Sequence, residues 1–291
     1  MSHPSTLKLP SGPLVVHDDG PVDGPAVVFV HGFLVDSRLW EATAEALADD
    51  HRVVRPDLPL GAHRTPIGTY AALSPRGVAR LVLELLDALD LEDVTLVGND
   101  TGGAICQFVL DERPSRVGRL VLTNCDGFET FPPAPFNLVH LLKRVPGGVE
   151  VALAPMRLRL GRHIALGTLA RTRIPDELLR AWSEPFLTDR AIRRETMTFL
   201  RAAWPRDLVE ASTRLHRFDG PVLLAWAPAD RFFTIGLARR LRDACRDARL
   251  VEIPDAKTFV AWDQPQRLAD EIRAFAAAQV AAAGAGSHSA G

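Results

Sequence analysis

Residues 97–104, with the sequence VGNDTGGA, set a carboxylate where a short apolar strand turns sharply into a helix. Residues 93–97 form the β-branched strand pattern, and residues 104–110 favour a helix. The apex of such a turn adopts a strained backbone conformation, and glycines beside it let neighbouring chains pass closely. Three glycines of the run meet this need: Gly98, Gly102 and Gly103. We therefore interpret the run as a nucleophile elbow with Asp100 at its apex.

The rest of the chain alternates strand and helix patterns. Buried-strand patterns are predicted at residues 25–33, 52–59, 118–123, 221–226 and 248–253. Helical periodicity is predicted at residues 75–89, 235–244 and 264–280. Such alternation favours an α/β fold with a mostly parallel sheet and helices on both faces. Between residues 128 and 217 the alternation breaks into helical stretches interrupted by prolines.

Together these motifs resemble the α/β-hydrolase superfamily, and within it the branch with an aspartate nucleophile, which includes haloalkane dehalogenases, fluoroacetate dehalogenases and epoxide hydrolases. The resemblance is carried by His31-Gly32 and by residues 98–103. It implies the α/β-hydrolase fold, a mostly parallel central sheet flanked by helices. The implied core covers residues 14–127 and 218–280, and a helical cap covers residues 128–217. We expect residues 281–291, rich in Ala, Gly and Ser, to be a disordered tail.

The resemblance also implies a catalytic chemistry. In this branch the aspartate, here Asp100, attacks an electrophilic carbon and forms an ester that water later hydrolyses. The backbone N–H groups of Phe33 and Thr101 correspond to the oxyanion hole. The acid partner corresponds to Asp230, and Asp126 is the alternative because some dehalogenases place their acid after that earlier strand. The competing interpretations are a helix N-cap for Asp100 and solvated loop acids for the other two.

The histidine that completes the family pattern is missing. Counting back from the Asp-Gln-Pro at residues 263–265, its position is held by Thr258. A hydroxyl cannot act as a general base near neutral pH, whereas an imidazole with a pKa of about 6.5 can. General-base activation is worth about 10²–10⁴-fold, so an ester on the aspartate would stall without it. His31 belongs to the loop motif, where its usual role is structural, and His140 and His163 lie in the predicted cap.

Markers of the individual reactions are also absent. Dehalogenases usually place a Trp directly after the nucleophile and often an Asn after His-Gly, where this chain has Thr101 and Phe33. Epoxide hydrolases use cap tyrosines, and the one tyrosine, Tyr70, lies outside the predicted cap. Trp182 and Trp204 are candidate N–H donors from the cap, or simple pocket walls.

Two classes of enzyme fit these residues. The first is a hydrolase acting on an ester, halide or epoxide type bond of a small, largely apolar substrate, with Asp100 as nucleophile. The second is a lyase, isomerase or cyclase in which Asp100 acts as acid or base, as a buried carboxylate with a raised pKa can. A ligand-binding or scaffold protein is the third interpretation, and the retained elbow disfavours it.

Composition narrows the partners. A formal net charge of -2 over 291 residues gives no reason to expect a nucleic acid or an anionic membrane. Three cysteines and a start without a signal pattern favour a cytoplasmic protein with reduced thiols. No metal cluster or nucleotide-binding glycine pattern is present, so neither cofactor nor metal is expected. We expect a small-molecule substrate as the partner, and a monomer or homodimer.

Overall fold

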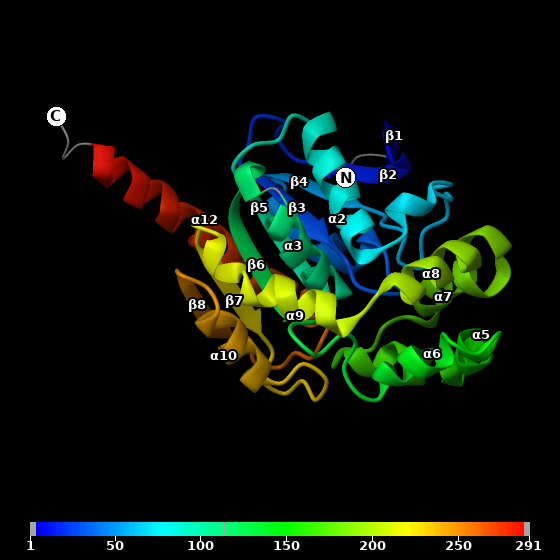
Figure 1. Ribbon diagram of the computed structural model, residues 1–291. Coiled ribbons are helices and arrows are strands. Elements are labelled where there is room, and N and C mark those ends of the chain that lie inside the picture. The colour runs from blue at the N-terminus through cyan, green and yellow to red at the C-terminus, as the bar shows by residue number, and fades with distance from the viewer. Residues whose placement is uncertain (1–3, 113, 288–291) are drawn as a thin grey trace.

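The structure, a computed structural model, describes residues 4–112 and 114–287. Its strands are β1 (Ser5–Leu9), β2 (Gly12–Asp19), β3 (Ala26–Val30), β4 (Arg52–Pro56), β5 (Val94–Asp100), β6 (Val117–Cys125), β7 (Val222–Trp226) and β8 (Ala248–Glu252). They form one sheet in the order β1-β2-β4-β3-β5-β6-β7-β8 (Figure 1). In this order, neighbouring strands from β4 through β3 to β8 pair in parallel. β1 and β2 pair antiparallel with each other, and β2 also pairs antiparallel with β4. The predicted mostly parallel sheet is therefore confirmed, and the β1–β2 hairpin is an addition to it.

Helices cover both faces of the sheet. α2 (Pro75–Ala88) and α3 (Thr101–Glu112) pack against each other in front of the sheet in Figure 1, and α12 (Pro265–Ser287) packs with α1 (Glu41–Leu47). The central strands are buried on both faces, which explains why β3 is apolar throughout. α12 continues to Ser287, so most of the expected disordered tail is helical, and residues 288–291 lie outside the described residues.

A helical excursion between β6 and β7 covers the carboxyl ends of the strands (Figure 1). Its α-helices up to residue 202 are α4 (Val139–Leu142), α5 (Gly148–Leu153), α6 (Arg159–Ala165), α7 (Asp176–Thr188) and α8 (Arg190–Ala202). The next helix, α9 (Pro205–Thr213), packs against α3, where the Ser212 hydroxyl donates to Gln107 Oε1 at 2.6 Å. The last part of the predicted cap thus lies in the core layer.

Buried carboxylates tie the second half of the cap to the core. Glu195 of α8 accepts hydrogen bonds from the backbone N–H groups of Ile67 and Gly68, at 3.0 and 2.8 Å. Asp263, near the start of α12, accepts from the backbone N–H of Arg171 at 2.8 Å. A buried charge is tolerated only where such partners satisfy it, so these contacts fix α7 and α8 over the sheet.

Candidate active site

Asp100 lies at a strained turn between β5 and α3. Its backbone φ is 53°, in the left-handed region that few residues other than glycine adopt. Neighbouring segments of the chain approach so closely that a Cβ added at Gly102 would lie 2.1 Å from the carbonyl oxygen of Val30. A Cβ at Gly98 would lie 2.7 Å from the sulfur of Cys106. The strand, turn and helix predicted from the glycine pattern are confirmed, and the turn presents a side chain that is only partly buried.

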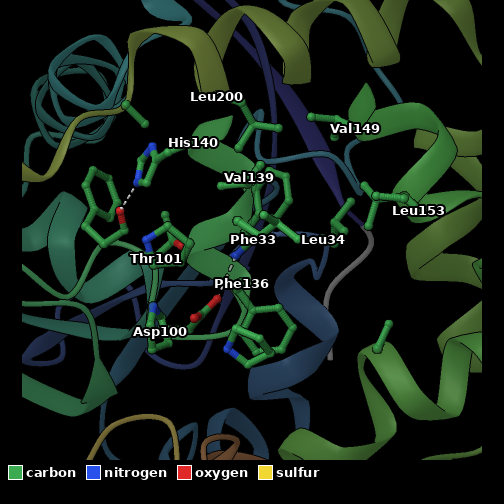
Figure 2. A pocket seen from close by; sticks show the side chains of 18 of the residues that line it. Phe33, Leu34, Asp100, Thr101, Phe136, Val139, His140, Val149, Leu153 and Leu200 are labelled. Atoms are coloured by element: carbon green, nitrogen blue, oxygen red, sulfur yellow. Dashed lines mark hydrogen bonds between the residues drawn. The ribbon is translucent and has the colours of Figure 1, made fainter. Parts of the chain in front are cut away.

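Two backbone N–H groups bind the Asp100 carboxylate. Phe33 donates to Oδ2 at 3.0 Å (Figure 2), and the backbone N–H of Thr101 also stabilises the charge of this carboxylate. Gly32 makes the arrangement possible, because a Cβ there would lie 2.2 Å from the same oxygen. The two predicted oxyanion donors are therefore brought together on one carboxylate, with the geometry that stabilises negative charge on its oxygen.

Burial raises the pKa of Asp100 to about 6, the two N–H groups oppose that rise, and the charge of Asp230 adds to it. Asp126 lies beside this group and is fully buried, and burial together with the charge on Asp100 raises its pKa well above the usual range. Thr101 Oγ1 lies 3.2 Å from Asp126 Oδ2, and the other oxygen of Asp126 has no hydrogen-bond partner. Burial and the charge on Asp100 thus favour the protonated form of Asp126.

Asp230 and Thr258 are brought together, as the family pattern predicts. The Thr258 hydroxyl donates to Asp230 Oδ2 at 2.8 Å, and Asn124 Nδ2 donates to the same oxygen at 3.0 Å. The N–H of Phe232 donates to the other oxygen at 2.8 Å. Burial raises the pKa of Asp230, against these hydrogen bonds. Sequence reasoning missed Asn124, whose only signal is an amide side chain near the end of a buried strand.

An apolar cavity of about 320 Å³ lies above Asp100, within the range of small-molecule sites. The cap contributes Phe131, Phe136, Leu138, Leu142 and Phe199 to its lining, whereas the cap residues Leu141, Phe186 and Met197 do not line it. Figure 2 shows Asp100 and Thr101 at one end of the cavity, with Val149 and Leu153 across from them. Asp230 and Thr258 lie outside its lining.

His140 is the histidine that lines this cavity. Its Nε2 is 2.6 Å from the carbonyl oxygen of Phe131 and therefore donates to it, while Nδ1 is buried without a partner (Figure 2). Burial lowers the pKa of this imidazole, so the ring is neutral near pH 7. The other cap histidine, His163, lies 3.9 Å from Asp176 and does not line the cavity.

The remaining candidate side chains, two tryptophans and one histidine, form contacts outside the cavity. Trp182 donates its indole N–H to Asp36 at 2.8 Å rather than into the cavity, and Trp204 stacks on His140 with ring centroids 6.0 Å apart. Neither tryptophan lines the cavity. His31 Nε2 accepts from the N–H of Leu58 at 2.8 Å, so its Nδ1 donates to the carbonyl oxygen of Gly32. His31 is thus a structural link between the loops after β3 and β4.

Neither a metal centre nor a membrane span emerges from the described part of the chain. Within it, no three His, Cys, Asp or Glu side chains gather closely enough to hold a metal ion. Of the helices in the described ranges, none has the length and apolar character needed to span a bilayer.

A strand-to-helix elbow beneath a helical cap defines a class of enzyme folds, and sequence comparison identifies the class. The family described as "alpha/beta hydrolase fold" matches residues 25–265, and the chain belongs to this family. Haloalkane dehalogenase 2 of Mycobacterium tuberculosis is 30% identical over 262 residues, which cover 86% of this chain and 87% of that protein. Epoxide hydrolase 2 of Caenorhabditis elegans is 26% identical, with 86% of this chain and 73% of that protein covered.

Solved structures agree on the fold. A haloalkane dehalogenase loop variant from Bradyrhizobium elkanii superposes with a TM-score of 0.78 at 18% identity, covering 97% of this chain and 98% of its own. The relatives bear names of different reactions, so membership of the family identifies the fold and leaves the reaction to the site.

Proposed function

We propose that the protein is a hydrolase in which Asp100 attacks an electrophilic carbon of a small, largely apolar substrate with an ester, halide or epoxide type bond. The observation that carries this proposal is a carboxylate at a strained turn, bound by two backbone N–H groups, at the end of an apolar cavity. Attack at a saturated carbon forms an alkyl ester on Asp100 and breaks the bond from that carbon to the leaving group, so that a halide or carboxylate departs as the anion, or an epoxide oxygen becomes an alkoxide that takes a proton from water. When water adds to that ester, the same N–H groups stabilise the oxyanion that develops.

The protonation state of Asp100 supports this role. With its pKa raised to about 6, most of the group is ionised at neutral pH and available as a nucleophile. The lining of the cavity is largely apolar, and this low polarity strengthens the interaction of the carboxylate with a polarised carbon.

Hydrolysis of the ester is the step that the site supports least. Thr258 gives its hydroxyl hydrogen to Asp230 and supplies no basic nitrogen. Since general-base activation of water is worth about 10²–10⁴-fold, we expect formation of the ester to be faster than its hydrolysis. The ester on Asp100 should then accumulate.

The pKa of about 6 also favours a second candidate function. A carboxyl group that exchanges its proton near neutral pH is suited to general acid–base catalysis, and so to a lyase, isomerase or cyclase reaction. In that case Asp100 would move a proton and form no covalent bond to the substrate.

Isotope labelling separates these candidates. The protein is incubated with haloalkanes, epoxides and small esters in ¹⁸O-labelled water, and intact and peptide masses are measured, with Asp100→Asn as the control. The proposal expects a substrate adduct on the peptide that contains Asp100, or ¹⁸O in its carboxylate after hydrolysis, because water attacks the ester carbonyl. Turnover without adduct or label on Asp100 would favour the acid–base candidate. No turnover and no adduct across the panel would contradict the hydrolase.

A further inference from the structure

Exposed apolar side chains gather in one stretch of the cap. Among the described residues, eight of the nine exposed large apolar side chains lie between residues 136 and 164, and the ninth is Val22. The eight are Phe136, Leu138, Leu141, Val145, Val151, Leu158, Leu160 and Ile164. Leu158 and Leu160 are 69% and 71% exposed. We call residues 136–164 the apolar cap segment.

The same segment also lines the cavity from within. Val139, Val149 and Leu153 face the space above Asp100 (Figure 2), and Met156 also lines the cavity. The short helices α4, α5 and α6 therefore carry apolar side chains both toward the cavity and toward the outside, and they form a single layer between cavity and surroundings. α5 and α6 lie at the outer edge of the molecule, away from the sheet (Figure 1). Large apolar side chains exposed together in one segment mark an interaction surface.

The charge of the segment identifies what would cover it. The segment contains five Lys or Arg residues and one glutamate, a formal charge of +4, but Lys143 and Arg162 are buried and Arg162 pairs with Asp176, so its exposed cations are three arginines. Arg144, Arg157 and Arg159 are exposed, and the last two alternate with Leu158 and Leu160. This alternation of long cations and leucines suits a surface with anionic headgroups above an apolar layer.

We propose that the apolar cap segment docks on an anionic lipid surface. The exposed leucines enter the boundary between headgroups and acyl chains, and the arginines bind lipid phosphates. An apolar substrate dissolved in the lipid then has only the single layer of α4 to α6 between itself and the cavity. A second copy of the chain fits less well, because a two-fold interface would place the arginines of one copy against those of the other. The proposal rests on this surface and not on the chemistry of Asp100.

Flotation with lipid vesicles tests the proposal. The full chain is mixed with vesicles of phosphatidylcholine alone, or with about a third of phosphatidylglycerol, at low and high salt. We expect flotation with the anionic vesicles that weakens at high salt. The double variant Leu158→Ser/Leu160→Ser should lose at least about tenfold in partitioning, since it removes two side chains that would leave water. Arg157→Gln/Arg159→Gln should lose about fivefold for each arginine.

Matched controls lie elsewhere on the surface. Val22→Ser removes an equally exposed apolar side chain, 70% exposed, and Arg239→Gln removes an exposed arginine on α10 (Ile235–Asp243). Both should float like the parent protein, and so should Asp100→Asn, which separates this proposal from the proposed hydrolase. No flotation of the parent protein would overturn the proposal, as would equal losses in the controls. A dimer that Leu158→Ser/Leu160→Ser dissociates, without vesicle binding, would assign the surface to a subunit interface instead.

Discussion

The two sides of the site differ in completeness. On the nucleophile side, a strained turn, two backbone donors and the missing side chain of Gly32 all serve the carboxylate of Asp100. On the opposite side, Asp230 remains in place but its partner is the hydroxyl of Thr258, 2.8 Å away. Under the proposed function, formation and hydrolysis of the ester therefore depend on separate groups of residues, so that one step can be retained without the other.

The largest effect should come from removing the nucleophile. Asp100→Asn keeps the shape of the side chain, and Asn tolerates the left-handed backbone, but the amide cannot form the ester. We expect the rate of adduct formation, followed by intact mass, to fall by at least about 10³-fold. Adduct formation at the parental rate would show that Asp100 is not the nucleophile.

The same variant should be more stable than the parent protein at neutral pH. Because the pKa of Asp100 is about 6 in the folded protein and 3.8 is its ordinary value, the folded state binds more protons between these values. Stability therefore falls as pH rises from 4 to 6, by about 2 kcal/mol, and the variant is spared this loss. Chemical denaturation should show the gain at pH 8 and little of it at pH 4.

The next largest effect should come from introducing the missing imidazole beside Asp230. Thr258→His places an imidazole beside Asp230, which can orient it as a general base toward the ester. We expect ester hydrolysis, measured as decay of the adduct, to accelerate by about 10²-fold. Thr258→Val, which lacks both hydroxyl and imidazole, is the matched control and should show no gain. An equal gain in both variants would mean that space for water, rather than a base, limits hydrolysis.

The pH dependence of adduct formation should follow Asp100 alone. Only the ionised carboxylate is nucleophilic, so the rate should be constant above about pH 7 and half-maximal near the pKa of about 6. Below that pH it should fall about tenfold per unit. A profile that stays flat down to pH 4 would show that the carboxylate ionises as an ordinary aspartate does.

The smallest effect should come from Asp230→Asn in the parent background. Asp230 influences Asp100 only through the last of the causes that shift its pKa, so adduct formation should change by less than about threefold. In the Thr258→His background the same change should abolish the gain in hydrolysis, because the imidazole loses the group that orients it. A large loss of adduct formation in the parent background would show that Asp230 and Asp100 act together in forming the ester. Thermal unfolding of each variant shows whether loss of the hydrogen bonds to the Asp230 carboxylate has destabilised the fold.

Local sequence signals predicted the sheet and the elbow well. The strand and helix around Asp100 follow from hydrophobic runs and glycines within ten residues, and the pairing of Asp230 with Thr258 follows from the family spacing. The contacts of Trp182 could not be predicted, because Asp36 is 146 positions away. The environment of Asp126 is equally non-local, since its pKa depends on complete burial and on the charge of Asp100.

Composition averaged over the chain concealed the cap surface. A net charge of -2 gave no reason to expect a membrane, yet the apolar cap segment carries +4 within 29 residues. The exposure of its leucines depends on how short helices pack over the cavity, and hydrophobic periodicity does not report which side of so short a helix stays uncovered.

The space that Gly32 leaves empty has a consequence for how this enzyme can change. Since a methyl group at that position would occupy the volume of the Asp100 carboxylate, position 32 cannot gain a side chain while the aspartate is present. An alanine there would be admissible only after residue 100 had become smaller. The constraint runs in one direction across sixty-eight positions of the chain, because residue 100 can change while Gly32 stays.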